Sequence, residues 1–369
     1  MIMMYDKNDV MRLAKRQNNS KRSYLLVNPL QAKHIPVSPS KAFDMMCALG
    51  DILKNENSQL IIGFAETATA VGAVSAMCFP DDTYYMHTTR EFYDSDNVLN
   101  FCEEHSHAVQ QQLFYPPFNL RPDRVIMIDD EISTGKTIKN IVDVMRREFS
   151  AFRDSEFIVG CVINRIDSQR EEELLKKNIK FVSLVKISND NLEEAVRGIN
   201  AEPAVLPDKS REYSGKVIFA RSRIPDMRKG LKAGDMKRQL IAFTDECIQY
   251  LRPDFENCKK VLVLGTEECM LPAIMLGMAA EKIFDCKIYT HSTTRSPIGI
   301  NNAENYPCRN GFQIKSFYED GRLNYLYNID KYDAVAVVTD SKNDVQCERA
   351  FRDIMSVFSD CGRFYLIRG

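Results

Sequence analysis

Two adjacent carboxylates followed by a run of hydroxyl residues mark the segment that can do chemistry. Residues 125–128 are apolar, as in a buried strand, and lead into Asp129 and Asp130. Hydroxyls, a glycine and a lysine then open a helical pattern: Ser133, Thr134, Gly135, Lys136 and Thr137. Backbone N–H groups at such a helix start form a cradle for a phosphate dianion. Because the carboxylates would repel a phosphate, we expect them to face a diol, such as the hydroxyls of a ribose.

The triplet Gly-Lys-Thr at 135–137 also occurs in the phosphate loop of nucleotide triphosphatases. That motif requires a glycine where Asp130 stands. A triphosphatase is therefore the weaker interpretation.

Short apolar runs alternate with helical patterns along the chain, which is typical of a parallel sheet covered by helices. We expect strands near 24–27, 59–63, 83–86, 124–129, 156–163 and 180–184. Helices are expected at 39–54, 66–77, 135–149, 168–176 and from 188 to about 199. A stretch rich in Pro, Gly and charge near Leu206 indicates a linker. The predicted fold is α/β, with two Rossmann-like parallel-sheet domains at 1–205 and 206–369.

The second half of the chain echoes the first in the same order. Residues 60–72 resemble 262–277, with Glu66 matched by Glu268; residues 85–91 resemble 289–297; and the segment from 124 resembles the one from 333. Three echoes in one order indicate a duplication. In the second copy the acidic pair and the glycine are absent, so we expect a degenerate duplicate.

The string from 125 to 137 resembles the phosphoribosyl pyrophosphate signature of type I phosphoribosyltransferases. The resemblance implies that Asp129 and Asp130 hold the ribose and, indirectly, Mg²⁺, while 133–137 bind the 5-phosphate. It implies that Arg90 and one further loop bind pyrophosphate; the loop residues are Ala65, Glu66, Thr67, Ala68 and Thr69. Glu66 is unusual beside an anion, and a magnesium ion, a substrate amine or a helix-capping role could each explain it.

Two further segments match parts of these enzymes by position. The polar stretch with Glu104, His105 and His107 corresponds to the mobile loop that closes over the site. A metal site is the alternative for these histidines. Lys33 and His34 follow the first expected strand, where the family builds a hood over the acceptor.

The Thr-Thr-Arg-Ser-Pro run at 293–297 resembles the TRSP domain that follows a phosphoribosyltransferase in a family associated with tellurite-resistance and stress operons. This resemblance implies a role in making a nucleoside-like metabolite. Polar residues at equivalent strand ends form a possible second site: Glu268, His291, Thr294, Arg295 and Ser296. A remnant used for packing or dimerisation is an equal alternative.

The expected activity is Mg²⁺-dependent transfer of 5-phosphoribosyl from phosphoribosyl pyrophosphate to a nitrogen acceptor, or the reverse. The alternative is a regulator that binds phosphoribosyl pyrophosphate or a nucleotide without turnover. Family resemblance implies a homodimer.

Composition narrows the possible partners and location. With 49 basic and 51 acidic residues, the formal charge of −2 argues against nucleic acid or an anionic membrane as a partner. The 11 cysteines show no paired CxxC pattern and no apolar run approaches a membrane span. We therefore expect a cytoplasmic protein with reduced cysteines.

Overall fold

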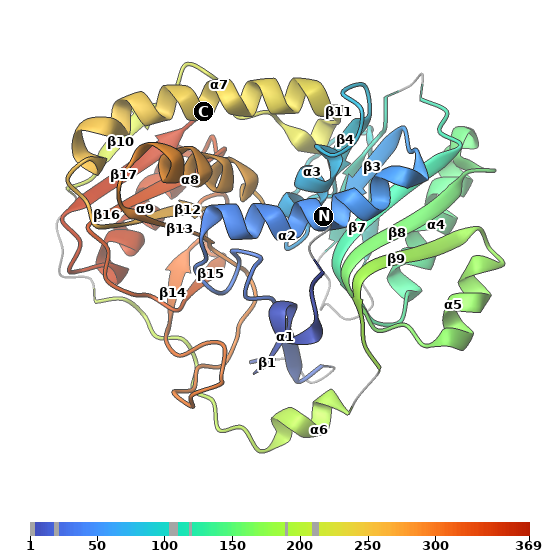
Figure 1. Cartoon of the computed structure of the whole chain (residues 1–369), viewed down its shortest axis with the longest axis horizontal. Coiled ribbons are helices and arrows are strands. Elements are labelled where there is room, and N and C mark those ends of the chain that lie inside the picture. Colours follow the sequence, from blue (N-terminus) through green and yellow to red (C-terminus); the bar gives the residue numbers. More distant parts are fainter. Residues whose placement is uncertain (1–3, 18–21, 103–109, 118–119, 189–190, 209–213) are drawn as a thin grey trace. The chain divides into compact units, whose positions relative to one another are not determined.

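The computed structural model describes residues 4–17, 22–102, 110–117, 120–188, 191–208 and 214–369 (Figure 1). The chain forms two compact units, neither of which is continuous in sequence. The first contains Met1–Val10, Asp44–Asp190 and Pro225–Arg238; the second contains Met11–Phe43, Asn191–Ile224 and Gln239–Gly369. The expected linker position near Leu206 lies in the second unit. Among the residues described, no helix is long and apolar enough to cross a membrane.

The first unit is built on a sheet with the order β11-β4-β3-β7-β8-β9 (Figure 1). All neighbours pair in parallel except the short β11. The strands are β3 (Leu60–Gly63), β4 (Tyr84–His87), β7 (Arg124–Ile132), β8 (Glu156–Asn164), β9 (Ile179–Lys186) and β11 (Leu231–Lys232), with a separate hairpin of β5 (Val98–Cys102) and β6 (Gln110–Phe114). Its helices are α1 (Lys7–Val10), α3 (Thr69–Ala76), α4 (Lys136–Glu148) and α5 (Ser168–Leu175), with short 3-10 turns η1 (Lys54–Glu56), η2 (Ser150–Phe152) and η3 (Met227–Lys229).

The second unit has a wholly parallel sheet with the order β10-β17-β16-β12-β13. These strands are β10 (Lys216–Phe219), β12 (Lys260–Gly265), β13 (Lys287–Ser292), β16 (Ala334–Thr339) and β17 (Arg363–Arg368). Two antiparallel pairs accompany the sheet: β1 (Arg12–Lys15) with β2 (Tyr24–Val27), and β14 (Gly311–Lys315) with β15 (Leu323–Tyr327). The helices are α6 (Leu192–Arg197), α8 (Leu271–Ile283) and α9 (Asp344–Val357); α2 (Pro39–Leu53) and α7 (Ala233–Phe255) each contain residues of both units.

Hydrophobic patterning explains why these elements form. All four residues of β3 are buried, as expected of a central strand covered on both faces. In α4 the buried residues recur at helical spacing: Ile138, Ile141, Val142 and Met145. They join the side chains of β3, β7 and β8 in one core.

The α/β class with parallel sheets is confirmed, and three details differ from the sequence-based expectation. The strand at 24–27 exists, but it pairs antiparallel with β1 in the second unit and not with the large parallel sheet. Strand β7 continues past Asp129 to Ile132. The helix expected from residue 66 begins at Thr69, because residues 65–68 form turns.

Candidate functional site

The carboxyl ends of three neighbouring strands gather the predicted residues of the first unit. Strand β3 pairs with both β4 and β7, and Gly63 lies opposite His87 and Ile128. The segments that follow these positions therefore meet at one edge of the sheet, where parallel sheets place their ligands. They contain the 65–69 loop, Arg90 and the acidic pair with its phosphate loop.

The acidic pair lies within the last residues of strand β7 and not beyond its end. Asp129 and Asp130 are half-buried, and the Asp130 N–H donates to Asp129 Oδ1 at 2.9 Å. The next residue, Glu131, forms a buried ion pair with Arg165 at 2.7 Å, with side-chain exposures of 11% and 3%. Arg165 also donates its backbone N–H to Ile132 at 2.8 Å. The third carboxylate of the run is thus neutralised by the protein, which sequence reasoning missed.

The predicted phosphate loop, residues 133–137, turns sharply at Gly135, the residue before α4. Its φ is 67°, and a Cβ there would lie 2.8 Å from Leu174 Cδ1 and 3.1 Å from Ile166 Cδ1. Glycine is therefore needed both for the left-handed conformation and for the space. The Lys136 N–H donates to Thr134 Oγ1 at 3.3 Å. Among the rest of this loop Thr134 and Lys136 are exposed, while Ser133 and Thr137 are half-buried, so the helix start is open to an anion.

A ring of three hydrogen bonds fixes the start of the 65–69 loop. The Ala65 N–H donates to Thr88 Oγ1 at 2.8 Å, and this hydroxyl donates to Gln111 Oε1 at 2.7 Å. Gln111 Nε2 then donates to the Ala65 carbonyl at 3.1 Å. Gln111 is almost wholly buried, at 1% exposure. It was not expected from the sequence, because no local pattern marks it.

Glu66 follows a cis peptide bond and is buried. Helix α3 begins three residues later, and its first turn contains no acidic residue. Glu66 therefore does not lie where a carboxylate stabilises the helix dipole. The backbone carbonyl of Glu66 accepts a hydrogen bond from Thr69 Oγ1 at 3.2 Å, which closes the loop onto α3.

Arg90 lies just beyond β4, at a point held by two backbone contacts. The Thr88 N–H donates to the Gly63 carbonyl at 2.9 Å, and Thr89 exchanges both backbone hydrogen bonds with Gln112 at 2.8 Å. Arg90 is half-buried. The β5–β6 hairpin is thereby attached beside it.

The remaining predicted residues of the first site either lie outside the described residues or belong to the second unit. Glu104, His105 and His107 lie outside the described residues. Lys33 and His34 belong to the second unit, where both are buried. There Lys33 Nζ donates to the backbone carbonyl of Glu267 at 2.7 Å, and the His34 carbonyl accepts a bond from Asn328 at 2.8 Å.

The corresponding edge of the second sheet is centred on Glu267, which sequence reasoning missed. Its carboxylate is wholly buried and lies 2.8 Å from Arg295 Nε and 3.2 Å from Arg322. It also accepts hydrogen bonds from Ser316 at 2.6 Å and Asn324 at 2.5 Å. This carboxylate therefore has charged and neutral donors on several sides, as a buried charge requires.

Of the five residues expected at the second site, four lie at this edge. Arg295 Nη2 lies 4.0 Å from Glu268 Oε1, and the Ser296 N–H donates to Thr294 Oγ1 at 3.2 Å. His291 differs, because it lies within β13 and is buried. Burial lowers the pKa of His291 to about 4, and its Nε2 lies 2.9 Å from the Tyr327 carbonyl. It is a neutral core residue at physiological pH.

The two edges share hydrogen bonds at matching positions. The Thr293 N–H donates to the Gly265 carbonyl at 3.1 Å, as Thr88 does to Gly63. The Glu267 N–H donates to Thr293 Oγ1 at 2.9 Å, as Ala65 does to Thr88. Backbone hydrogen bonds join Thr294 to Tyr325, as they join Thr89 to Gln112.

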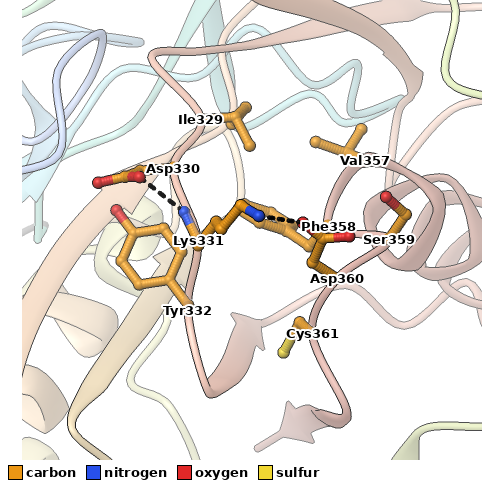
Figure 2. Close-up of a pocket in the computed structure, with 9 residues that line it drawn as sticks. All are labelled: Ile329, Asp330, Lys331, Tyr332, Val357, Phe358, Ser359, Asp360 and Cys361. Carbon is orange, nitrogen blue, oxygen red and sulfur yellow. Dashed lines mark hydrogen bonds and ion pairs between the residues drawn. The ribbon is translucent and has the colours of Figure 1, made fainter.

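A separate concavity of about 270 Å³ lies at the opposite edge of the second sheet, before the first residues of β16 and β17 (Figure 2). Lys331 projects across it and forms an ion pair with Asp360 at 2.9 Å. Asp330, on its rim, pairs with Lys260. Its charges are thus matched within the protein, and it lies at the amino ends of the strands, away from the candidate site of the second unit.

Family comparison agrees with this geometry. Residues 10–202 match a family of phosphoribosyl transferases, and residues 227–355 match the TRSP domain that lies C-terminal to that family. The chain belongs to this phosphoribosyltransferase family. The acidic pair and residues 133–137 of this phosphoribosyltransferase lie at the edge formed by β3, β4 and β7. None of the curated proteins matches the chain.

Solved structures that resemble this phosphoribosyltransferase include adenine and orotate phosphoribosyltransferases. The adenine enzyme of Trypanosoma brucei is 16% identical, with 49% of this chain and 79% of that chain covered and a TM-score of 0.36. The adenine enzyme of Leishmania tarentolae is 16% identical, with 53% of this chain and 90% of that chain covered and a TM-score of 0.36. The orotate enzyme of Aeropyrum pernix is 16% identical, with 52% of this chain and 94% of that chain covered and a TM-score of 0.28.

Proposed function

We propose that the first unit transfers the 5-phosphoribosyl group from phosphoribosyl pyrophosphate to a nitrogen acceptor, or catalyses the reverse reaction. In the forward direction the acceptor nitrogen forms a bond to C1 of the sugar while the bond from C1 to pyrophosphate breaks. The observation that carries the proposal is the left-handed Gly135 at the start of α4, in the turn that follows the strand holding the acidic pair. This turn and the 65–69 loop, whose start is held by hydrogen bonds to Thr88 and Gln111, lie at the ends of adjacent strands.

The residues divide into three roles. Asp129 and Asp130 hold the ribose hydroxyls and favour the positive charge that develops at C1. Residues 133–137 bind the 5-phosphate at the helix start. The 65–69 loop and Arg90 bind the leaving pyrophosphate, to which a guanidinium can donate two parallel hydrogen bonds.

Magnesium fits this site as an ion shared with the substrate. Among the described residues, no cluster of three or more His, Cys, Asp or Glu side chains could hold a metal by itself. Asp129 and Asp130 are half-buried hard-oxygen donors, and Mg²⁺ commonly takes one or two carboxylates together with substrate phosphates. The bound ion would neutralise the charge of the leaving pyrophosphate. Glu66 is a further oxygen donor on the pyrophosphate side.

The second unit is proposed to be a degenerate copy of the first. Its strand order β13-β12-β16-β17 repeats the order β4-β3-β7-β8, and the matching hydrogen bonds at the two edges support a common origin. Glu267 stands where the first unit has Ala65, and its carboxylate forms ion pairs with Arg295 and Arg322. An internal anion in that position favours a role other than turnover of phosphoribosyl pyrophosphate. The site of Glu268, Thr294, Arg295 and Ser296 remains a proposed binding surface.

Further expectations from the family resemblance and from composition complete the proposal. Glu104, His105 and His107 would belong to the loop that closes over the substrate, and Lys33 and His34 would contribute to acceptor binding. The reaction would be one step in the synthesis of a nucleoside-like metabolite linked to stress or tellurite resistance. The enzyme would act in the cytoplasm as a homodimer.

Calorimetry with phosphoribosyl pyrophosphate and Mg²⁺ tests the proposed site. We expect micromolar binding by the wild type and at least about a hundredfold loss in the Asp129→Asn, Asp130→Asn double variant, because two charged hydrogen-bond acceptors are removed. Asp143→Asn is the matched control, since Asp143 is an exposed residue of α4 paired with Lys139. Candidate bases are then screened for release of pyrophosphate. Absence of binding by the wild type would overturn the transferase proposal.

A further inference from the structure

Two cysteines from different helical segments of the first unit come together away from the candidate site. Cys47 lies in α2, and Cys78 lies two residues beyond the end of α3. The Cys78 thiol donates a hydrogen bond to the Cys47 carbonyl oxygen at 3.8 Å, and each thiol shifts the pKa of the other. Both residues are partly exposed, so small thiol reagents can reach the pair.

The absence of a side chain at Gly50 allows this approach. A Cβ at Gly50 would lie 2.7 Å from Cys78 Sγ and 2.8 Å from the Cα of Ser75. The backbone of α2 therefore packs directly against the end of α3. Such closeness is what a disulfide requires, because its two Cα atoms are usually about 4.4–6.8 Å apart.

The two thiols differ in their electrostatic surroundings. The pKa of Cys78 is lowered, chiefly by the hydrogen bond from Cys47, and the charges of Lys54 and Lys237 act in the same direction. The pKa of Cys47 is raised, chiefly by the same hydrogen bond, then by burial. Cys78 is therefore the better thiolate of the pair.

Three other described cysteines lack these features. Burial raises the pKa of Cys161 well above its usual value and raises that of Cys247 to about 12. Cys286 is partly exposed, but burial and neighbouring charges raise its pKa to about 11. These thiols are expected to react slowly.

We propose that Cys47 and Cys78 form a reversible disulfide, with Cys78 as the attacking thiolate and Cys47 as the resolving thiol. The oxidant is a small disulfide such as oxidised glutathione. Cys78 attacks one of its sulfurs, forms a mixed disulfide and expels one glutathione thiolate. Cys47 then loses its proton to solvent and attacks Cys78 Sγ, which forms the protein disulfide and expels the second glutathione. Two protein thiols are oxidised and one oxidised glutathione is reduced.

The influence of each thiol on the other favours this order of steps. In the reduced protein the neighbouring Cys78 is the main cause of the raised pKa of Cys47, so Cys47 stays in the thiol form. Once Cys78 Sγ is part of a mixed disulfide, its thiolate no longer exists. The main cause of the raised pKa of Cys47 is then removed, and Cys47 lies next to the sulfur that it must attack.

Mass spectrometry after oxidation of the full native chain tests the proposal. Trypsin separates the two cysteines, because Cys47 falls in the peptide 42–54 and Cys78 in the peptide 55–90. With oxidised glutathione we expect these peptides to become linked, and dithiothreitol to separate them. Cys47→Ser should accumulate the mixed disulfide on Cys78, whereas Cys78→Ser should be modified about tenfold or more slowly.

The control and the opposing outcomes are equally defined. Cys286→Ser should leave the linked pair unchanged. Linkage only after the protein is denatured would overturn the proposed pair, and equal modification rates in the two single variants would overturn the proposed order. The test does not use the transferase reaction, so its outcome is independent of the function proposed for the site.

Discussion

Replacing Gly135 by alanine tests the geometry on which the phosphate site depends. At φ 67° an alanine loses about 1–2 kcal/mol relative to glycine. Its Cβ would also lie 2.8 Å from Leu174 Cδ1 and 3.1 Å from Ile166 Cδ1. Since both atoms are the ends of flexible side chains, the added crowding should cost about 1–2 kcal/mol, in the lower part of the range for overpacking. We therefore expect the first unit to lose about 2–4 kcal/mol of stability.

Hydrogen-exchange mass spectrometry is the suitable measurement, because it follows peptides of α4 and β7 separately from the second unit. A midpoint for the whole chain would combine two units that need not unfold together. Binding of phosphoribosyl pyrophosphate should weaken roughly tenfold or more, because relief of the crowding displaces the helix start that holds the phosphate.

Two other glycines separate the contributions. Gly321 also has a positive φ, of 76°, but has no atom within 4 Å of an added Cβ, so Gly321→Ala should lose only about 1–2 kcal/mol in the second unit. Gly198 has an ordinary φ and open space, so Gly198→Ala should change stability by no more than about 1 kcal/mol. Unchanged exchange and ligand binding in Gly135→Ala would refute the reasoning.

Three further predictions concern other residues. Gln111→Leu removes the donor to the Ala65 carbonyl, and a buried carbonyl left without a partner costs about 1–3 kcal/mol. The KM for phosphoribosyl pyrophosphate should therefore rise roughly tenfold in steady-state assays, and a change in kcat alone would contradict this prediction. Glu267→Gln leaves Arg295 and Arg322 without their carboxylate and should destabilise the second unit by about 3–5 kcal/mol, as measured by hydrogen exchange. Calorimetric binding of phosphoribosyl pyrophosphate should stay unchanged, and its loss in this variant would contradict the assignment of the binding site to the first unit. His291 has a pKa depressed to about 4, so it remains neutral in the folded protein while the unfolded chain takes up a proton, and the second unit should lose about 3 kcal/mol of stability as pH falls from about 6.5 to 4. His291→Gln should flatten this pH dependence in hydrogen-exchange measurements, and an unchanged slope would argue against the role of His291.

Local patterns in the sequence determined most of the first unit. The buried strands β3 and β7 are continuous apolar runs, and Gly135 marks the turn into α4. These features are local, because the side-chain periodicity and the backbone freedom of glycine act over a few residues. The strand that holds the acidic pair and the turn into α4 were accordingly predicted from the sequence, while phosphate binding by residues 133–137 stays a prediction.

Boundaries were less well determined where hydrogen bonds override periodicity. Apolar spacing alone predicts a helix from residue 66, but α3 starts at Thr69. Thr88 and Gln111 hold Ala65 in a turn, and neither is near it in sequence. Strand β7 likewise extends to Ile132, because β8 continues alongside and pairs with it.

Only the tertiary structure decided the partners of residues far apart in the chain. The strand at 24–27 pairs with β1 in the second unit, and Lys33 meets Glu267 there. The pairs of Glu131 with Arg165 and of Glu267 with Arg322 follow from strands and a hairpin that pack together. Such contacts depend on which buried surfaces and strand edges match across the fold, and no sequence periodicity encodes that match.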